Sequence, residues 1–241
     1  MNFKDTMERF KISKRYKDIF DLYIHKGEPV PFTIGTIAVW GFCFLMLILT
    51  TFTQLNFSDS WLKCLSGANE AVYSPQIPVM LFIIYLMGRN YSILLFITYL
   101  ITGFFFLPIF AFGGGVGFAQ NYLFGYFLGF LVAIFTVSLL LKKSIGIKMR
   151  ILAALAGVFS IHVTGFLYCF ILAIFQVIDP GLILPIIKAL SANKLLYDIL
   201  FGLIILLIAP YIKNIFWICM KPKADDSKKS RKSLRKIQSN S

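Results

Sequence analysis

Charged residues are scarce in this sequence, and carboxylates are scarcer than cations. Only 15% of the 241 residues are charged, and 11 Asp and Glu stand against 24 Lys and Arg. The four cysteines are Cys43, Cys64, Cys169 and Cys219, which are too widely spaced for a zinc or thioredoxin-type motif. The sequence contains no His-Glu-x-x-His pair and no Gly-x-Ser-x-Gly elbow. It therefore predicts no metal site, no cofactor and no catalytic residues.

Apolar residues are present in large excess. They make up 58% of the chain, with 26 Phe and 11 Tyr, and the mean hydropathy is +0.78. A soluble domain of this length cannot bury so much apolar surface, and so many aromatic residues exclude a disordered chain. The composition predicts an all-α, polytopic membrane protein, because a membrane-spanning helix needs about 20 mostly apolar residues. Six apolar runs predict six transmembrane helices: Phe32–Leu55, Gln76–Met87, Tyr91–Phe112, Tyr122–Leu141, Ile151–Ile178 and Leu195–Trp217. The second run is short and begins among prolines, so we expect it to be a partial or tilted span.

The cations are unevenly distributed along the chain. Seven Lys and Arg lie in residues 1–30 and eight in residues 221–241. With six spans, 21 of the 24 cations fall on the side that holds both termini, and only Lys63, Lys188 and Lys194 fall on the other. Cytoplasmic loops carry the excess of Lys and Arg, so both termini are predicted to be cytoplasmic, in the cytoplasmic (inner) membrane. Cations concentrated at chain ends also argue against a nucleic-acid partner.

Three regions follow from this distribution. Residues 1–30 carry apolar side chains at helical spacing among cations, which indicates either an amphipathic helix at the cytoplasmic lipid surface or a solvated helix packed on the cytoplasmic loops. Residues 31–218 form the membrane domain. Residues 219–241 form a basic tail that is predicted to be disordered and attracted to anionic membrane lipid.

Polar residues inside the predicted spans are candidates for function, because they are costly in lipid. His162 lies in the fifth span, where an interhelical hydrogen-bonding role is favoured over proton transfer. Asp198 lies in the first turn of the sixth span. It is either a carboxylate stabilised by the helix N-terminus or an acceptor for a polar ligand that enters from outside.

A glycine stretch follows the break at Pro108 in the third span. Glycines allow the backbone to approach a ligand closely, and the absence of a following Lys-Ser/Thr pair argues against ATP. We expect a backbone-lined wall for a small ligand here, with polar contacts and apolar walls from flanking residues. These candidates are Gly113, Gly114, Gly115, Gln120, Asn121, Phe112 and Tyr126. Gly125 and Gly129 are expected to serve close helix packing.

An ordered set of motifs runs through this region: Ser74-Pro75-Gln76-Ile77-Pro78-Val79, then Gly88-Arg89 at the next turn, Gly103, Phe106-Leu107-Pro108-Ile109-Phe110, the glycine stretch and Gly125-Tyr126-Phe127-Leu128-Gly129-Phe130. The set resembles the BioY family, the biotin-binding membrane subunits of energy-coupling-factor transporters. The resemblance implies six helices with cytoplasmic ends and biotin, or a similar vitamin, as ligand. It also implies a transmembrane coupling subunit and cytoplasmic ATPases as partners.

The resemblance runs from about Tyr73 to Phe135, and the chain departs from the family in the last helix. Members of the family carry an Asp and a Lys there, and this chain has Asp198 but Phe201 at the position of the Lys. Lys194, Lys188 or backbone amides would then bind the biotin carboxylate. The sequence thus predicts a substrate-capture subunit for biotin and no enzyme. The alternatives are a capture subunit or carrier for another small vitamin, a structural subunit and a membrane-embedded lipid-modifying enzyme.

Overall fold

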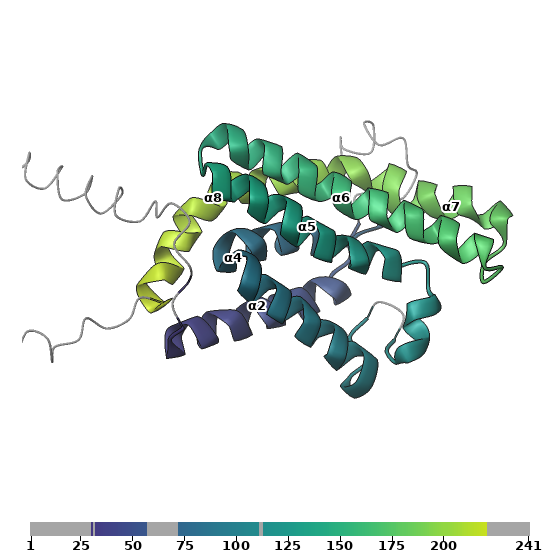
Figure 1. Ribbon diagram of the computed structural model, residues 1–241, viewed down its shortest axis with the longest axis horizontal. Coiled ribbons are helices and arrows are strands. Elements are labelled where there is room, and N and C mark those ends of the chain that lie inside the picture. Colours follow the sequence, from purple (N-terminus) through teal and green to yellow (C-terminus); the bar gives the residue numbers. More distant parts are fainter. Residues whose placement is uncertain (1–29, 31, 57–71, 111–112, 221–241) are drawn as a thin grey trace, which may run out of the picture.

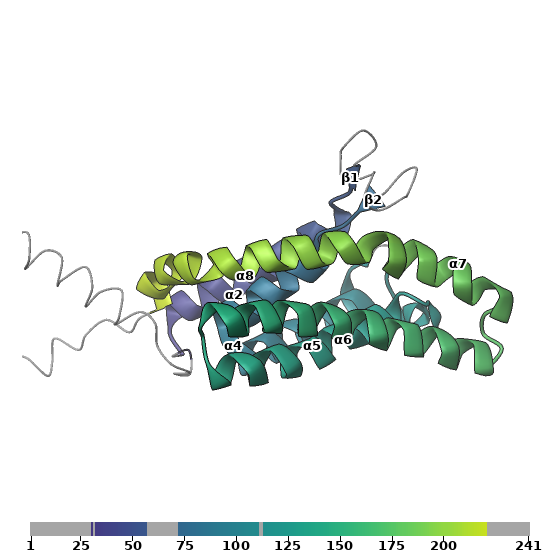
Figure 2. The same ribbon diagram turned by 90° about the horizontal axis from the view of Figure 1, so that it is seen from above.

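The computed structural model describes residues 30, 32–56, 72–110 and 113–220, which form a bundle of helices (Figures 1 and 2). The long helices are α2 (Ile34–Phe52), α4 (Gln76–Ile101), α5 (Phe124–Lys143), α6 (Ile147–Ile174) and α8 (Asn193–Met220). The short elements are β1 (Leu55–Asn56), β2 (Val72–Tyr73), the π-helix η1 (Thr102–Phe106), the 3-10 helices η2 (Val116–Gln120) and η3 (Pro180–Leu182), α7 (Ile183–Ile187) and the π-helix η4 (Lys188–Ala192).

The predicted all-α class is confirmed. The two strands have two residues each and pair antiparallel, with Leu55 opposite Tyr73. The predicted amphipathic segment and basic tail lie outside the described residues, apart from Val30, Cys219 and Met220. The structure therefore describes the membrane domain and leaves the predictions for the two ends as predictions.

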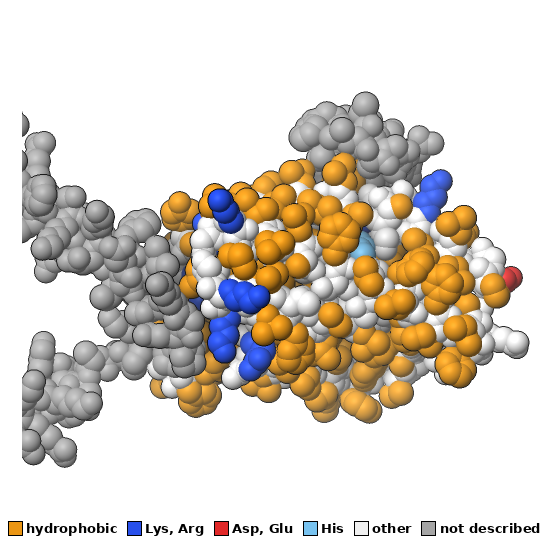
Figure 3. Space-filling view, turned by 45° about the horizontal axis from the view of Figure 1, so that its top comes forward, with side chains coloured by type: hydrophobic (Ala, Val, Ile, Leu, Met, Phe, Trp, Pro, Cys, Tyr) orange, Lys and Arg blue, Asp and Glu red, His pale blue; other side chains and the backbone are white. Residues whose placement is uncertain are grey.

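Apolar side chains cover the outside of the bundle (Figure 3). Ile34 is 88% exposed, Phe32 79% and Leu184 76%. Within the described ranges, five helical stretches are long and apolar enough to cross a membrane: Ile34–Phe52, Gln76–Phe106, Phe124–Lys143, Ile147–Ile174 and Pro180–Trp217. An apolar exterior of this extent is stable only in lipid, so the chain is a multi-pass membrane protein.

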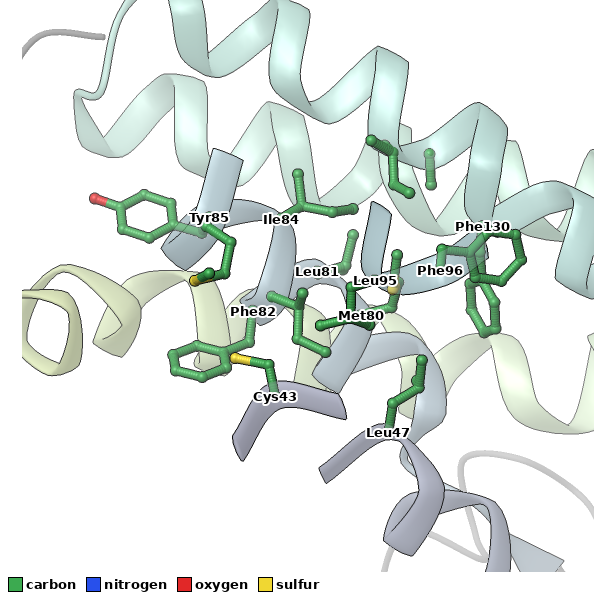
Figure 4. Packing of buried hydrophobic residues seen from close by; sticks show 14 of the residues in the cluster. Cys43, Leu47, Met80, Leu81, Phe82, Ile84, Tyr85, Leu95, Phe96 and Phe130 are labelled. Carbon is green, nitrogen blue, oxygen red and sulfur yellow. The ribbon is translucent and has the colours of Figure 1, made fainter. Parts of the chain in front are cut away.

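Helix α4 forms the centre of the bundle and contacts α2, α5 and α8. It is apolar on all sides, as expected of a helix surrounded by others. Leu81 and Met80 are fully buried in its first half, between Cys43 and Leu47 of α2 and the helices behind them (Figure 4). This apolar packing fixes the positions of the elements that carry the polar residues described below.

Helix α4 contains a sharp break. Gly88 has φ +72° and ψ −179°, a backbone conformation that glycine adopts without strain. The Ser92 hydroxyl donates to the Ile83 carbonyl over 3.3 Å, although the two residues are nine positions apart. A straight helix would separate them by about 13 Å. The two halves of α4 therefore fold back on each other at the predicted Gly88-Arg89 turn.

This break explains why five long stretches stand where six spans were predicted. Helix α4 contains the second and most of the third predicted span. The first half, Gln76–Met87, would extend about 18 Å as a straight helix, against roughly 30 Å of hydrocarbon. The expected partial character of this span agrees with its length, because 12 residues are too few to cross unaided. The count of six spans stays a prediction.

The two ends of the described chain lie together. The Thr33 hydroxyl donates to the Met220 carbonyl over 2.9 Å, and Gly35 packs directly on the Cys219 carbonyl. The start of α2 and the end of α8 are therefore adjacent. Most Lys and Arg side chains that are visible in Figure 3 gather at this same end, called the basic end below.

Candidate functional site

Asp198 lies where three elements from distant parts of the sequence meet. It is only 2% exposed. The Tyr73 hydroxyl, from β2, donates to Oδ1 over 2.9 Å. His162 Nε2, from α6, lies 3.2 Å from Oδ2. An ionised Asp198 therefore has a hydrogen-bond donor on each oxygen, as a buried carboxylate requires.

The hydrogen bonds continue beyond His162. Its Nδ1 lies 3.0 Å from the Ser191 hydroxyl, which lies 2.6 Å from the Tyr126 hydroxyl. These five residues, Tyr73, Asp198, His162, Ser191 and Tyr126, are called the Asp198 network. It joins β2, α5, α6, η4 and α8 through side chains alone. Interhelical hydrogen bonding by His162 is confirmed.

Aromatic rings hold Tyr73 in place. Its ring lies 5.6 Å from the ring of Tyr197 and 5.4 Å from that of Phe201, measured between centroids. Burial raises the pKa of Tyr73 above its ordinary value, and the charge of Asp198 and the hydrogen bond to it raise the pKa further. Tyr73 therefore remains a neutral donor toward the carboxylate across the physiological range.

Lys194 stands one turn before Asp198 on α8. It is half-buried, and its charge interacts with that of Asp198. Residues four apart on a helix lie on the same face, so Lys194 places a cation next to the network. Lys188 lies six positions before Lys194, at the start of η4.

Asp198 does not lie at a helix N-terminus. The helical path runs from η3 through α7 and η4 into α8 without a gap. Asp198 therefore sits inside a continuous helical stretch, far from the free N–H groups of a first turn. Placing it in the first turn of a spanning helix was wrong, and the helix-terminus explanation for its position fails with it.

The described part of the glycine stretch forms a tight loop. Phe110 and Gly113 exchange two backbone hydrogen bonds of 3.0 Å each, and the Gly115 N–H donates to the Gly103 carbonyl over 2.9 Å. Gly113 has φ +102° and Gly115 φ +94°, so these positions require glycine. Gly114 packs on the backbone of Gly103 and Pro108.

The Phe110 ring fills the space enclosed by this loop. It stacks on Phe118 with centroids 4.4 Å apart and also contacts Tyr99, Phe104 and Phe127. The Phe110 ring occupies the position that a Cβ on Gly103 would take, so a residue with a side chain does not fit there. The glycines thus allow the loop to close over an aromatic cluster.

The other predicted site residues are divided between the two regions. Tyr126 belongs to the Asp198 network, whereas Gln120 is exposed at the end of η2. The Asn121 carboxamide oxygen accepts from the Leu123 N–H over 2.9 Å, in the turn that precedes α5. Phe112 lies outside the described residues. The structure therefore brings together Asp198, Tyr126 and Lys194, and it adds Tyr73, His162 and Ser191.

The junction of β2 and α4 connects the two regions. Tyr73 bonds Asp198, as described above. Three residues later, the Gln76 carboxamide donates to the Thr51 hydroxyl over 2.6 Å. Thr51 lies 3.0 Å from the Tyr99 hydroxyl, which contacts the Ile109 carbonyl at 3.4 Å. This short segment thus bonds the Asp198 network directly and is linked to the start of the glycine loop through Thr51 and Tyr99.

Residues 45–217 match the BioY family. The chain belongs to the BioY family. Comparison with the curated proteins gives no match. Among solved structures, the fold is similar to a crystal structure of the S-component for biotin from an ECF-type ABC transporter, with a TM-score of 0.56 and 18% identity over 76% of this chain and 95% of the other.

The BioY match includes the whole Asp198 network and the glycine loop, and it excludes residues 1–44 and 218–241. Within the matched region, sequence reasoning did not select Tyr73 or Ser191 and gave His162 a structural role only. One signal in the sequence could have indicated the network. His162 and Asp198 are rare polar residues in apolar spans, and each needs a hydrogen-bond partner because polar groups are costly in lipid.

Gly125 and Gly129 of the matched region have the expected packing role. Gly125 faces Tyr168 of α6, and a Cβ on Gly129 would come within 2.7 Å of the Ile161 backbone. These contacts allow α5 and α6 to lie close together. Tyr126, between the two glycines, then reaches past Gly165 of α6 to the network.

Proposed function

We propose that this BioY-family chain is the substrate-capture subunit of a vitamin transporter and that it binds biotin at the Asp198 network. The observation that carries the proposal is a buried carboxylate with several hydroxyl and imidazole partners, held inside the matched region. Asp198 precedes Met220 by 22 helical residues, or about 33 Å, so the network lies far from the basic end. A ligand would approach from the opposite side of the membrane.

The chemistry of the network suits biotin. Its ureido ring carries two N–H donors and one carbonyl acceptor. Asp198 supplies the acceptor for an N–H, and the hydroxyls of Tyr126 and Ser191 supply donors for the carbonyl. Tyr197 and Phe201 supply apolar surface, and Lys194 supplies a cation for the carboxylate at the far end of the aliphatic chain. A few polar groups among aromatic walls are typical of small-ligand sites.

We extend the proposal to the topology and the partners. The fold-back of α4 gives the chain six traversals, with both termini on the cytoplasmic side and the Asp198 network near the outer surface of the cytoplasmic membrane. The sequence contains no ATP-binding segment, so transport needs a transmembrane coupling subunit and cytoplasmic ATPases.

Ligand titration of the purified full chain tests the proposal. We expect biotin to bind, and riboflavin and thiamine not to bind. Asp198→Asn should weaken biotin binding about ten-fold or more, because a hydrogen bond to a charged group contributes roughly 1.5–3 kcal/mol. Asp179→Asn is the matched control, since Asp179 is an exposed carboxylate near the same end of the bundle. Absence of biotin binding, or equal losses in both variants, contradicts the proposal.

One observation favours a second candidate, a membrane-embedded hydrolase that acts on lipid. Ser191, His162 and Asp198 stand in the order of a catalytic triad, but His162 presents Nδ1 to the serine and Nε2 to the carboxylate. Ser191 also lies within a helical stretch, where the Asn193 N–H is already bonded to the carbonyls of Lys188 and Ser191. An oxyanion hole of free N–H groups is therefore missing at this point. Turnover of a lipid ester that Ser191→Ala abolishes would favour this candidate over capture.

A further inference from the structure

A second cluster of polar residues lies at the basic end, far from Asp198. It begins at Pro210, inside α8, where the helix changes direction (Figure 1). Proline has no N–H, so the Leu206 carbonyl loses its helical partner. Arg150 of α6 compensates: its Nη1 donates to the Leu206 carbonyl over 3.3 Å and to the Leu207 carbonyl over 3.0 Å. One cation thus reaches the first helix break.

A second cation reaches the other helix break of the bundle. Lys213, one turn after Pro210, donates to the Tyr85 carbonyl over 3.1 Å. In an unbroken helix this carbonyl would accept from Arg89, but the backbone of Gly88 interrupts α4. The Lys213 Nζ also lies 5.4 Å from the centroid of the Tyr85 ring.

Tyr85 is the residue of α4 that Lys213 contacts. The Lys213 ammonium bonds the Tyr85 carbonyl and lies over its ring, and the charge of Arg150 is near enough to act on the Tyr85 hydroxyl. The hydroxyl points away from the packed apolar side chains (Figure 4). Helices α6, α8 and α4 thus each supply one donor group to this part of the basic end: Arg150, Lys213 and the Tyr85 hydroxyl.

The cations of this end have no carboxylate partner among the described residues. The described carboxylates are Asp179 and Asp198, which both lie toward the opposite end. The described cations at the basic end are Arg89, Lys142, Lys143, Lys148, Arg150 and Lys213. Arg150 Nε is buried and has no hydrogen-bond partner within the described ranges, and a lysine ammonium has two donors beyond the one used here. Buried donors without acceptors are costly and point to a missing anion.

We propose that Arg150, Lys213 and the Tyr85 hydroxyl bind a phosphate group, supplied by the headgroup of an anionic phospholipid. Phosphate accepts hydrogen bonds only, and it matches the paired donors of a guanidinium. Basic pockets between transmembrane helices on the cytoplasmic side take anionic headgroups. Phosphate binding would neutralise two cations that hold α8 against α4 and α6, so the lipid stabilises the bundle at its two helix breaks.

The test measures thermal stability and lipid binding of the full chain in nanodiscs. Phosphatidylglycerol is titrated against phosphatidylcholine, and inorganic phosphate is titrated in detergent. The titrations are carried out at high salt, because salt screens exposed surface charges more than a buried pair of charges. The variants are Tyr85→Phe, which keeps the ring and carbonyl, and Lys213→Gln, which keeps a donor for that carbonyl. Lys143→Gln, at the exposed end of α5, is the matched control for the loss of one charge.

We expect phosphatidylglycerol to bind and stabilise the chain, whereas phosphatidylcholine does not. Tyr85→Phe and Lys213→Gln should each weaken that binding about ten-fold, and Lys143→Gln less than about two-fold. The same pattern with inorganic phosphate supports the site with free phosphate as its ligand. Equal losses in all three variants indicate diffuse surface charge and overturn the proposal, as does the absence of any response to both probes. If Lys213→Gln does not fold, the comparison of lipid binding between Tyr85→Phe and Lys143→Gln tests the proposal by itself.

Discussion

Replacement of Tyr73 by phenylalanine isolates one hydrogen bond of the Asp198 network. The change removes a single hydroxyl and keeps the ring that packs on Tyr197 and Phe201. Asp198 is 2% exposed, so water does not replace the lost donor on Oδ1. A hydrogen bond to a charged group contributes roughly 1.5–3 kcal/mol, and we expect the free energy of unfolding to fall by about that amount.

Unfolding in detergent by added denaturant, followed by aromatic fluorescence, measures this change. Tyr211→Phe is the matched control, because Tyr211 lies on α8 and is 61% exposed. It should change the free energy of unfolding by less than about 0.5 kcal/mol. In an Asp198→Asn background the Tyr73→Phe effect should shrink, since the charged acceptor is gone. A Tyr73→Phe variant as stable as Tyr211→Phe would refute the view that the carboxylate depends on this donor.

The pH dependence of stability gives an independent check on the same bond. The pKa of Tyr73 is raised above the ordinary 10.0, mainly by burial and then by Asp198. A raised folded-state pKa means that the contribution of the phenol is fully present below about pH 10 and is lost as the pH rises further. The free energy of unfolding should therefore decline above about pH 10, and Tyr73→Phe should lessen that decline. An identical alkaline decline in both proteins would contradict this reasoning.

Two further predictions concern packing and topology. Gly129→Ala places a Cβ within 2.7 Å of the Ile161 backbone, whereas a Cβ at Gly41 meets nothing within 4 Å. Denaturant unfolding should show that Gly129→Ala lowers the free energy of unfolding by about 1–3 kcal/mol and that Gly41→Ala leaves it almost unchanged. Single cysteines at Ser144, between α5 and α6, and at Gly181, after α6, should label with a membrane-impermeant thiol reagent from opposite sides in intact cells, Gly181 from outside. Labelling of both positions from the same side would disprove the proposed orientation.

The fold was largely predictable because its main determinants are local. The runs of apolar residues predicted the helices, and the observed bounds of α5 and α6 differ from the predicted ones by two to four residues. The pair Gly88-Arg89 predicted the turn, since glycine permits the positive φ that is observed there. The number of full spans was not predictable from runs alone: the first half of α4 is short, and its packing against α2 and the second half of α4 is a tertiary property.

The candidate site was only partly predictable because its residues meet from distant positions. Asp198 was selected as a rare polar group in lipid, and Tyr126 as an apolar wall, whereas in the structure the Tyr126 hydroxyl bonds Ser191. Tyr73 lies 125 positions before Asp198, and His162 lies 36 positions before it. No spacing in the sequence connects them. Ser191 is a common residue in a segment without a motif, so only its contacts with His162 and Tyr126 distinguish it.

The sequence by itself determined that this chain inserts into a membrane and folds into helices. Both properties depend on runs of apolar residues no longer than one membrane span. The sequence also determined which end carries the cations, because charge position along the chain follows directly from the spans. Only the tertiary structure decided which polar side chains form hydrogen bonds with one another. Buried polar groups must find partners wherever the packing of helices places them, and that packing is settled by the shapes of many apolar side chains together.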